Sequence, residues 1–319
     1  AQFITLSPTN QLVPTTDYAF SYESSSQELK LSISDASDSS SNWLEFVLVK
    51  KIQSWMESCD GQDNQLKIES HQLINSEAYN KKYAELKEKH GKKLEENWTE
   101  STDPKKFIYE DIAIASYLIV LWEEERRKIS SESLQSFVDL GCGNGLLVFI
   151  LSQEGHRGYG IDLRKRKIWD KFPVATDLRE FAIVPSDASL FSDVDWIIGN
   201  HSDELSPWIP VISARSSFAS KFFLLPCCAY EFSGVKFQRR SGTKSQYSSY
   251  IDYLMTISEA CGFLDTKLDR LKIPSTKRIC LIGGERTFDE KEFEINCEKI
   301  QNFINSDSSS GTTEKWSSS

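Results

Sequence analysis

Apolar positions change their spacing along this chain, and the change separates a helical part from a mixed one. Between Lys105 and Arg127 they recur every three or four residues, which predicts a long helix, and Asp103-Pro104 is a typical helix start. After it, short apolar runs alternate with helical stretches. The expected strands are 137–140, 158–162, 181–184, 194–199, 221–225 and 278–282, and the expected helices are 145–154 and 245–261. This alternation predicts an α/β fold, with a mostly parallel twisted sheet and helices on both faces.

The remaining segments suggest a division of the chain into five parts. The predicted parts are 1–41, a partly extended and flexible segment; 42–130, a helical region; 131–285, the α/β domain; 286–305, a C-terminal helix; and 306–319, a disordered Ser-rich tail. Trp208 lies between Pro207 and Pro210, which suggests a packed, rigid loop.

Composition narrows the class of protein. The 319 residues are 39% hydrophobic, enough for a real core, but no run of 18 apolar residues predicts a membrane span. The first residues do not resemble a secretory signal, and the chain lacks an initiator Met, so we expect a fragment or an excised piece. Seven scattered cysteines without a C-x-x-C pair favour a reduced, intracellular protein with no metal site. Cys227-Cys228 is interpreted as two small buried residues at a strand end.

Charge is unevenly placed. A net charge of −10 argues weakly against binding of nucleic acid by the surface as a whole. Residues 221–280, however, hold ten Lys and Arg against five Asp and Glu. Local charge matters more than the total for a polyanionic partner.

The richest candidate chemistry lies just after the strand at 137–140. Its segment contains an acid followed by a glycine-rich turn and the start of a helix: Asp139, Gly141, Cys142, Gly143, Asn144 and Gly145. Glycines allow positive φ and a close approach of ligand, and a helix start offers free N–H groups and a positive dipole end. The acid suits a cation and the turn suits an anion. The methionine part of S-adenosylmethionine carries both groups.

A dinucleotide site is the main alternative for this turn. Its fingerprint is G-x-G-x-x-G, whereas this turn has G-x-G-x-G, with Leu146 where the third glycine would stand. Asp139 would also repel a pyrophosphate. Asp162, followed by Leu163, ends the next strand, where a carboxylate can accept hydrogen bonds from both ribose hydroxyls.

Further polar residues follow the later strands. Asp187 is a candidate for the adenine amine or else a loop cap, and Asn200, at the end of the strand at 194–199, is a further candidate for cofactor binding. His201, Asp203 and Glu204 come next, beside the expected position of the sulfonium. They are candidates for a general base or acceptor-orienting group, with helix capping and charge pairing as the structural alternative.

Several blocks resemble one known family. Residues 107–115 (FIYEDIAIA), 138–147, 158–164, 198–210 (IGNHSDELSPWIP), 225–228 (LPCC) and 271–278 (LKIPSTKR) resemble the tRNA (uracil 2′-O-) methyltransferases, over roughly 105–285. The glycine-rich turn at 141–145 alone would show only the methyltransferase superfamily, whereas the NHSDE and IPSTKR blocks are far more specific to this family.

The resemblance implies a Rossmann-like class I methyltransferase fold, S-adenosyl-L-methionine as cofactor and a cytoplasmic setting. It also implies methylation of the ribose 2′-oxygen of uridine-44 in tRNA-Ser. Some members carry a C-terminal zinc-finger-like segment, which this sequence does not show.

A basic and aromatic segment suits an RNA substrate. The candidate phosphate- and base-binding residues are Lys236, Arg239, Arg240, Lys244 and Tyr247, with Lys277 and Arg278 further on. Ordinary surface charge is the alternative. Three other functions stay open: methylation of protein or small molecules, a non-catalytic tRNA-binding module, and a dinucleotide oxidoreductase.

Overall fold

The structure, a computed structural model, describes residues 16–23, 28–35, 37, 41–50, 52, 68–185, 191–239 and 244–308. The chain forms two compact units, residues 1–65 and 66–319. In the first unit, β1 (Tyr18–Glu23) pairs antiparallel with β2 (Glu28–Ile33). A helix follows, from α1 (Ser41–Trp43) into the π-helical η1 (Leu44–Val49).

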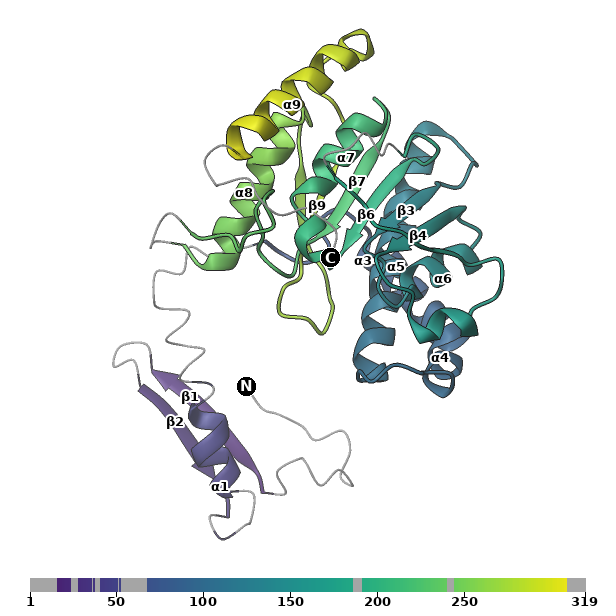
Figure 1. Ribbon diagram of the computed structural model, residues 1–319. Coiled ribbons are helices and arrows are strands. Elements are labelled where there is room, and N and C mark those ends of the chain that lie inside the picture. Colours follow the sequence, from purple (N-terminus) through teal and green to yellow (C-terminus); the bar gives the residue numbers. More distant parts are fainter. Residues whose placement is uncertain are drawn as a thin grey trace. The chain divides into compact units, whose positions relative to one another are not determined.

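The second unit is built on a seven-stranded sheet with the order β5-β4-β3-β6-β7-β9-β8 (Figure 1). Its strands are β3 (Phe137–Leu140), β4 (Gly158–Asp162), β5 (Asp177–Glu180), β6 (Trp196–Asn200), β7 (Lys221–Leu225), β8 (Lys267–Arg270) and β9 (Ile279–Gly283). All neighbours from β5 to β7 pair in parallel, and β9 runs antiparallel to both β7 and β8. The carboxyl ends of β3, β4 and β6 therefore lie at one edge of the sheet.

Helices cover both faces of this sheet, as Figure 1 shows. The helices of the unit are α3 (Ser76–Leu86), η2 (Lys87–Gly91), α4 (Lys92–Glu96), α5 (Pro104–Ile129), α6 (Leu146–Gln153), η3 (Lys167–Lys171), η4 (Asp203–Leu205), α7 (Trp208–Ser216), α8 (Gln246–Ala260), η5 (Glu290–Glu292) and α9 (Phe293–Ser308). Strand residues alternate between two cores: Phe137 packs with α5 and α6, and Val138 with α7 and α8. The predicted α/β class, with a mostly parallel sheet covered on both faces, is confirmed.

Helix α5 confirms the long helix predicted from residue 105. The Asp103 side chain accepts a hydrogen bond from the Lys105 N–H at 3.0 Å, and Pro104 occupies the first turn. The segment from Ile108 to Trp122 is almost wholly buried, including two adjacent acids. None of the described helices is both long and apolar enough to cross a membrane.

Two local predictions are wrong, and one strand was missed. The strand expected at 181–184 is instead β5, at 177–180, and Phe181 is 59% exposed. Strand β8 was not predicted. Both β5 and β8 are edge strands with polar residues, so they lack the apolar run that marks a central strand. Trp208 opens helix α7 rather than lying in a loop, because Pro210 in the first turn needs no N–H partner.

Candidate active site

The glycine-rich turn joins β3 to α6 through backbone conformations that favour glycine. Gly141, Gly143 and Gly145 have φ of 77°, 53° and 75°. A Cβ on Gly145 would lie 2.6 Å from Cδ1 of Leu178, whereas one on Gly143 would meet no described atom within 4 Å. A side chain at position 145 would therefore clash with Leu178, whereas the space beside Gly143 is open and can receive a ligand.

The Asp162 side chain fixes the conformation of this turn by hydrogen bonds to its backbone. Its carboxylate accepts hydrogen bonds from the Gly143 N–H at 2.8 Å and the Arg164 N–H at 3.1 Å, and Arg166 lies 3.9 Å away. Trp169 donates its indole N–H to the Gly143 carbonyl at 2.9 Å. Asp162 and the glycine turn, predicted to act on one ligand, are thus in direct contact. Leu163 beside them is exposed.

Cys142 and Asn144 complete the turn in structural roles. Burial raises the pKa of the Cys142 thiol, and a Cβ on Gly160 would lie 2.8 Å from its sulfur. Asn144 accepts a hydrogen bond from the Leu146 N–H at 2.8 Å and so caps the start of α6. Cys142 therefore contributes packing and its backbone, rather than a nucleophile.

Asp139 and Asp111 form a pair of buried carboxyl groups beneath the turn. Asp139 is 1% exposed, and its Oδ1 has no hydrogen-bond partner among the described residues. Asp111, from α5, accepts a hydrogen bond from the Asn200 side chain at 3.1 Å. Burial, with the neighbouring Asp111 carboxyl, raises the pKa of Asp139 well above its ordinary value, and burial raises that of Asp111 to about 7.

An unsatisfied buried carboxyl oxygen is costly, so this site favours a cationic ligand group. The residues therefore fit the amino acid end of S-adenosylmethionine: Asp139 and Asp111 would hold the cation, and Asp162 the ribose hydroxyls. Asp111 was missed from the sequence. Two adjacent acids inside an otherwise apolar helix segment are the signal that could have found it.

His201 is held by a second acid of α5. Its Nε2 lies 3.0 Å from Glu110 Oε1, which also accepts a hydrogen bond from the Ser275 hydroxyl at 2.5 Å. Burial opposes ionisation of Glu110, but the hydrogen bonds from His201 and Ser275 leave its pKa below the ordinary value. His201 has a φ of 53°, unusual for a residue with a side chain, and such strain concentrates at functional sites. Glu110 and Ser275 were also missed.

The side chains of Asp203 and Glu204 have different neighbours. Asp203 accepts a hydrogen bond from the Cys227 thiol at 3.2 Å, and the ligand-type atoms of Asp203, Cys227 and Cys228 all lie within 4.8 Å of one another. Both cysteines are half-buried rather than buried as predicted, and burial and Asp203 raise their pKa values. We assign no metal to this thiol–carboxylate cluster. Glu204 lies close enough to Lys236 for electrostatic attraction, but the two form no ion pair.

Some of the predicted RNA-binding side chains already pair with other groups of the protein, and others are available to bind RNA. Lys244 pairs with Asp252 at 2.6 Å, and the Tyr247 hydroxyl accepts a hydrogen bond from the Ile279 N–H at 3.1 Å. Lys236 and Lys277 are available, each above a tyrosine ring (Tyr230 at 4.0 Å and Tyr247 at 4.7 Å).

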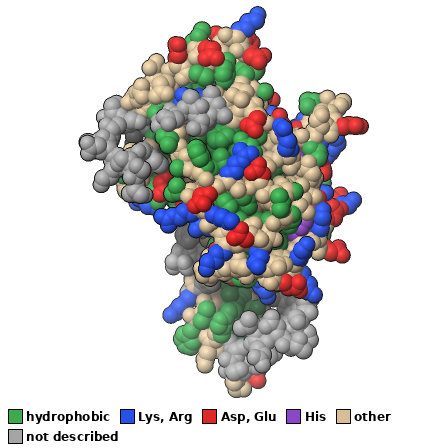
Figure 2. All heavy atoms as spheres, turned by 45° about the vertical axis from the view of Figure 1, so that its right-hand side comes forward, with side chains coloured by type: hydrophobic (Ala, Val, Ile, Leu, Met, Phe, Trp, Pro, Cys, Tyr) green, Lys and Arg blue, Asp and Glu red, His purple; other side chains and the backbone are tan. Residues whose placement is uncertain are grey.

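Arg239 donates to the Lys244 carbonyl at 3.0 Å, and the Arg278 Nε is buried without a partner among the described residues. Asp187 and Arg240 lie outside the described residues. On the face in Figure 2, Lys and Arg lie interspersed with Asp and Glu rather than in one basic field. Any RNA contact on such a face depends on a few well-placed cations.

Comparisons with known proteins agree with this geometry. A family described as "Predicted AdoMet-dependent methyltransferase" matches residues 73–185. The chain is 51% identical to the "Probable tRNA (uracil-O(2)-)-methyltransferase" of Homo sapiens over 264 residues, 83% of this chain and 34% of the relative. It is 39% identical to the "tRNA (uracil-O(2)-)-methyltransferase" of Schizosaccharomyces pombe over 63% of this chain and 46% of the relative. The chain is thus similar to these relatives over most of its own length.

The family match also covers the cofactor, because AdoMet is S-adenosyl-L-methionine, so that prediction and the predicted Rossmann-like class I methyltransferase fold are confirmed. The chain spans a third to a half of the length of these relatives. Among solved structures, the sugar N-methyltransferase KedS8 from Streptoalloteichus aligns with a TM-score of 0.38 at 14% identity, covering 55% of this chain and 88% of that one. A magnesium protoporphyrin IX methyltransferase from Synechocystis aligns with a TM-score of 0.38 at 13% identity, covering 65% and 99%.

Proposed function

We propose that this protein transfers a methyl group from S-adenosylmethionine to the ribose 2′-oxygen of a uridine in tRNA, with uridine-44 of tRNA-Ser as the acceptor. The observation that carries the proposal is the unsatisfied carboxyl of Asp139, buried beneath the glycine turn. The family relatives named tRNA (uracil-O(2)-)-methyltransferase support the acceptor class.

The donor site uses the chain's own charges. Asp139 and Asp111 hold a cation in a place from which water is excluded, where Coulomb attraction is strong. Asp162 accepts hydrogen bonds from the ribose, and the start of α6 receives the carboxylate. When bound, S-adenosylmethionine supplies an electrophilic methyl group on a cationic sulfur.

We assign the general base to His201. A ribose hydroxyl is a weak nucleophile until its proton is taken, so a base gives a rate advantage. The contact from Nε2 to Glu110 orients the imidazole and stabilises the charge that it gains with a proton. Asp203 is engaged with Cys227 and Glu204 lies near Lys236, so neither has this orienting partner.

The phosphates of the tRNA would be held by Lys236 and Lys277, with Arg239, which also donates to the Lys244 carbonyl, as a further candidate. Asn200, which links β6 to Asp111, keeps the acceptor end of the site aligned with the donor end. Placing both ends on one sheet edge supplies the proximity on which methyl transfer depends.

The proposed function is tested by methyl transfer from labelled S-adenosylmethionine to unmodified tRNA-Ser, with nuclease digestion and mass spectrometry of the nucleosides. The expected product is 2′-O-methyluridine at position 44. A methylated base, or transfer to protein but not to tRNA, would overturn the proposal. If S-adenosylhomocysteine gives no heat on titration, the chain is a non-catalytic module instead.

The base assignment is tested by comparing three variants. His201→Gln should lower kcat by about 100-fold, in the range expected for loss of a general base, while the affinity for S-adenosylhomocysteine stays unchanged. Asp203→Asn and Glu204→Gln serve as matched variants and should cost less. A larger loss in either of them would move the base away from His201.

A further inference from the structure

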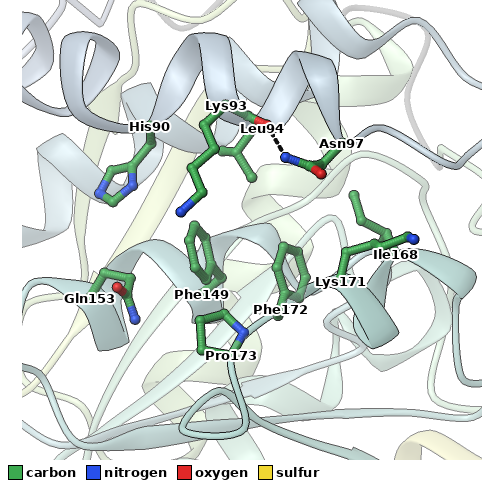
Figure 3. Close-up of a pocket in the computed structure, with 10 residues that line it drawn as sticks. All are labelled: His90, Lys93, Leu94, Asn97, Phe149, Gln153, Ile168, Lys171, Phe172 and Pro173. Atoms are coloured by element: carbon green, nitrogen blue, oxygen red, sulfur yellow. Dashed lines mark hydrogen bonds between the residues drawn. The ribbon is translucent and has the colours of Figure 1, made fainter.

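A hollow outside the donor site lies between α4 on one side and α6 with η3 on the other (Figure 3). Its volume is about 170 Å³. Ten residues line it: His90, Lys93, Leu94, Asn97, Phe149, Gln153, Ile168, Lys171, Phe172 and Pro173. Nothing in the donor or acceptor chemistry described above uses them.

The floor of the hollow is flat and apolar. The rings of Phe149 and Phe172 are stacked, with centroids 4.8 Å apart and an interplanar angle of 11°. Figure 3 shows them side by side below Lys93 and Leu94, with Pro173 beneath. Phe149 is 7% exposed and Phe172 is half-buried, so the two rings pack mainly on each other, and the accessible part of Phe172 is the contact that a planar ring, such as a nucleobase, can use.

The rim carries unpaired positive charge and free amide groups. Lys93 and Lys171 form no ion pair within the described ranges, although their neighbours do: Lys92 pairs with Glu96 at 3.9 Å and Lys89 with Glu154 at 2.7 Å. Burial lowers the pKa of His90, so that residue adds no charge. The Asn97 side chain donates to the Lys93 carbonyl at 2.7 Å, which leaves its oxygen free to accept.

We propose that this hollow binds one nucleotide unit, with the base against the phenylalanine floor and the phosphate between Lys93 and Lys171. The combination decides the ligand class: a purely apolar ligand leaves two lysines unpaired, and an inorganic anion leaves the aromatic floor uncovered. The nucleotide belongs to the RNA substrate, so this inference rests on the proposed function.

The position of the hollow supports an RNA source. Ile168 lines it, and the next residue, Trp169, donates to Gly143 of the donor turn at 2.9 Å. An RNA strand bound in the hollow would therefore run along the flank of the same turn. A second contact away from the acceptor nucleotide adds affinity and orients a large substrate.

The test compares two adjacent lysines of one helix. Lys93→Glu should weaken the binding of fluorescently labelled tRNA by about tenfold and lower the slope of log K against log salt by about one unit. Lys92→Glu makes the same charge change one residue away, outside the hollow, and should cost less than about threefold. Lys171→Glu should behave as Lys93→Glu, and Phe172→Leu should weaken tRNA binding by about threefold without changing the salt slope.

Titration with uridine monophosphate distinguishes the source of the nucleotide. Weaker binding of both tRNA and the monophosphate in Lys93→Glu supports the site and its RNA role. Loss of monophosphate binding alone supports the site but makes its ligand a free nucleotide. Equal effects of Lys92→Glu and Lys93→Glu, or no effect of either, would overturn the proposal. Affinity for S-adenosylhomocysteine and the nucleoside product report on the proposed function separately, since neither requires the hollow.

Discussion

Two buried aspartates of the same sheet, Asp139 and Asp269, have opposite surroundings. Asp269, on β8, is 0% exposed and accepts hydrogen bonds from four donors: the N–H groups of Gln72, Leu73 and Arg270 and the Tyr117 hydroxyl, at 2.7–3.1 Å. Asp139, on β3, is equally buried, but one of its oxygens has no partner among the described residues.

We infer from this difference that Asp269 has a structural role and Asp139 a functional one. Asp269 joins the segment before α3, helix α5 and strand β8, so its carboxylate stabilises the packing of distant segments. Asp139 has a raised pKa because burial and Asp111 disfavour its charge, and nothing in the described protein offsets this cost fully. We infer that this carboxyl group, buried with one unpartnered oxygen, serves to bind a cationic ligand rather than to stabilise the fold.

The largest expected effect is on the structural member of the pair. Asp269→Ala leaves three backbone N–H groups and the buried Tyr117 hydroxyl without this acceptor, so the free energy of unfolding should fall by about 3–5 kcal/mol. Denaturant titration measures it. The exposed Asp265, changed to Ala, is the control and should shift stability by less than about 0.5 kcal/mol. A loss below about 1 kcal/mol for Asp269→Ala would remove the distinction between the two sites.

The second effect is a pH dependence of stability without donor. An unfolded aspartic acid has a pKa of about 3.9, whereas Asp111 has a pKa of about 7 in the fold. Between these values the unfolded chain has lost the proton that the folded protein keeps. The contribution of Asp111 to the free energy of unfolding should therefore fall as the pH rises from about 4 to about 7, by roughly 2–4 kcal/mol, and level off above. Buried His71, whose pKa is lowered to about 4, contributes in the opposite direction over this range, so the Asp111 part is the difference between the wild type and Asp111→Asn.

Denaturant titrations across this pH range check the slope. Asp111→Asn no longer titrates at this position, so its free energy of unfolding should gain on that of the wild type as the pH rises through this window. A difference between the two proteins that does not change with pH would contradict the raised pKa of Asp111.

The third effect is on the functional member of the pair. Asp139→Asn removes the negative charge that would face the donor's amino group, so affinity for S-adenosylhomocysteine should fall by about 100-fold, or about 2.7 kcal/mol. The free energy of unfolding should stay level or rise, because a carboxyl group whose ionisation is disfavoured by burial is replaced by a neutral amide. Calorimetric titration and denaturant unfolding on the same sample give both numbers. A destabilised variant with intact affinity would reverse the roles of Asp139 and Asp269.

The smallest effect belongs to Asp162, which combines the two roles. It accepts the Gly143 N–H and is also the predicted ribose ligand. Asp162→Ala should weaken S-adenosylhomocysteine binding by about tenfold and lower the free energy of unfolding by about 1 kcal/mol. Affinity for tRNA, measured by fluorescence anisotropy, should change little. An equal loss of both affinities would contradict a ribose role.

The sequence by itself determined the elements that depend on neighbouring residues. The strands at 137–140, 158–162 and 221–225, the start of α5 and the glycine turn each carry a local signal, such as apolar runs, a capping acid or obligatory glycines. These signals were enough to predict the cofactor that the family match confirms, and to propose Asp139 and Asp162 as its ligands.

Only the tertiary structure decided which distant side chains meet. Glu110 contacts His201, 91 residues away, and Ser275, 165 residues away, and no periodicity in the sequence links these positions. The structure also separates available from engaged cations, since Lys244 and Lys236 look alike in the sequence but only Lys244 pairs with an acid. The reason is physical: burial and pairing depend on the crossing of helices and strands from far apart in the chain, whereas turns and periodic faces are set by adjacent residues.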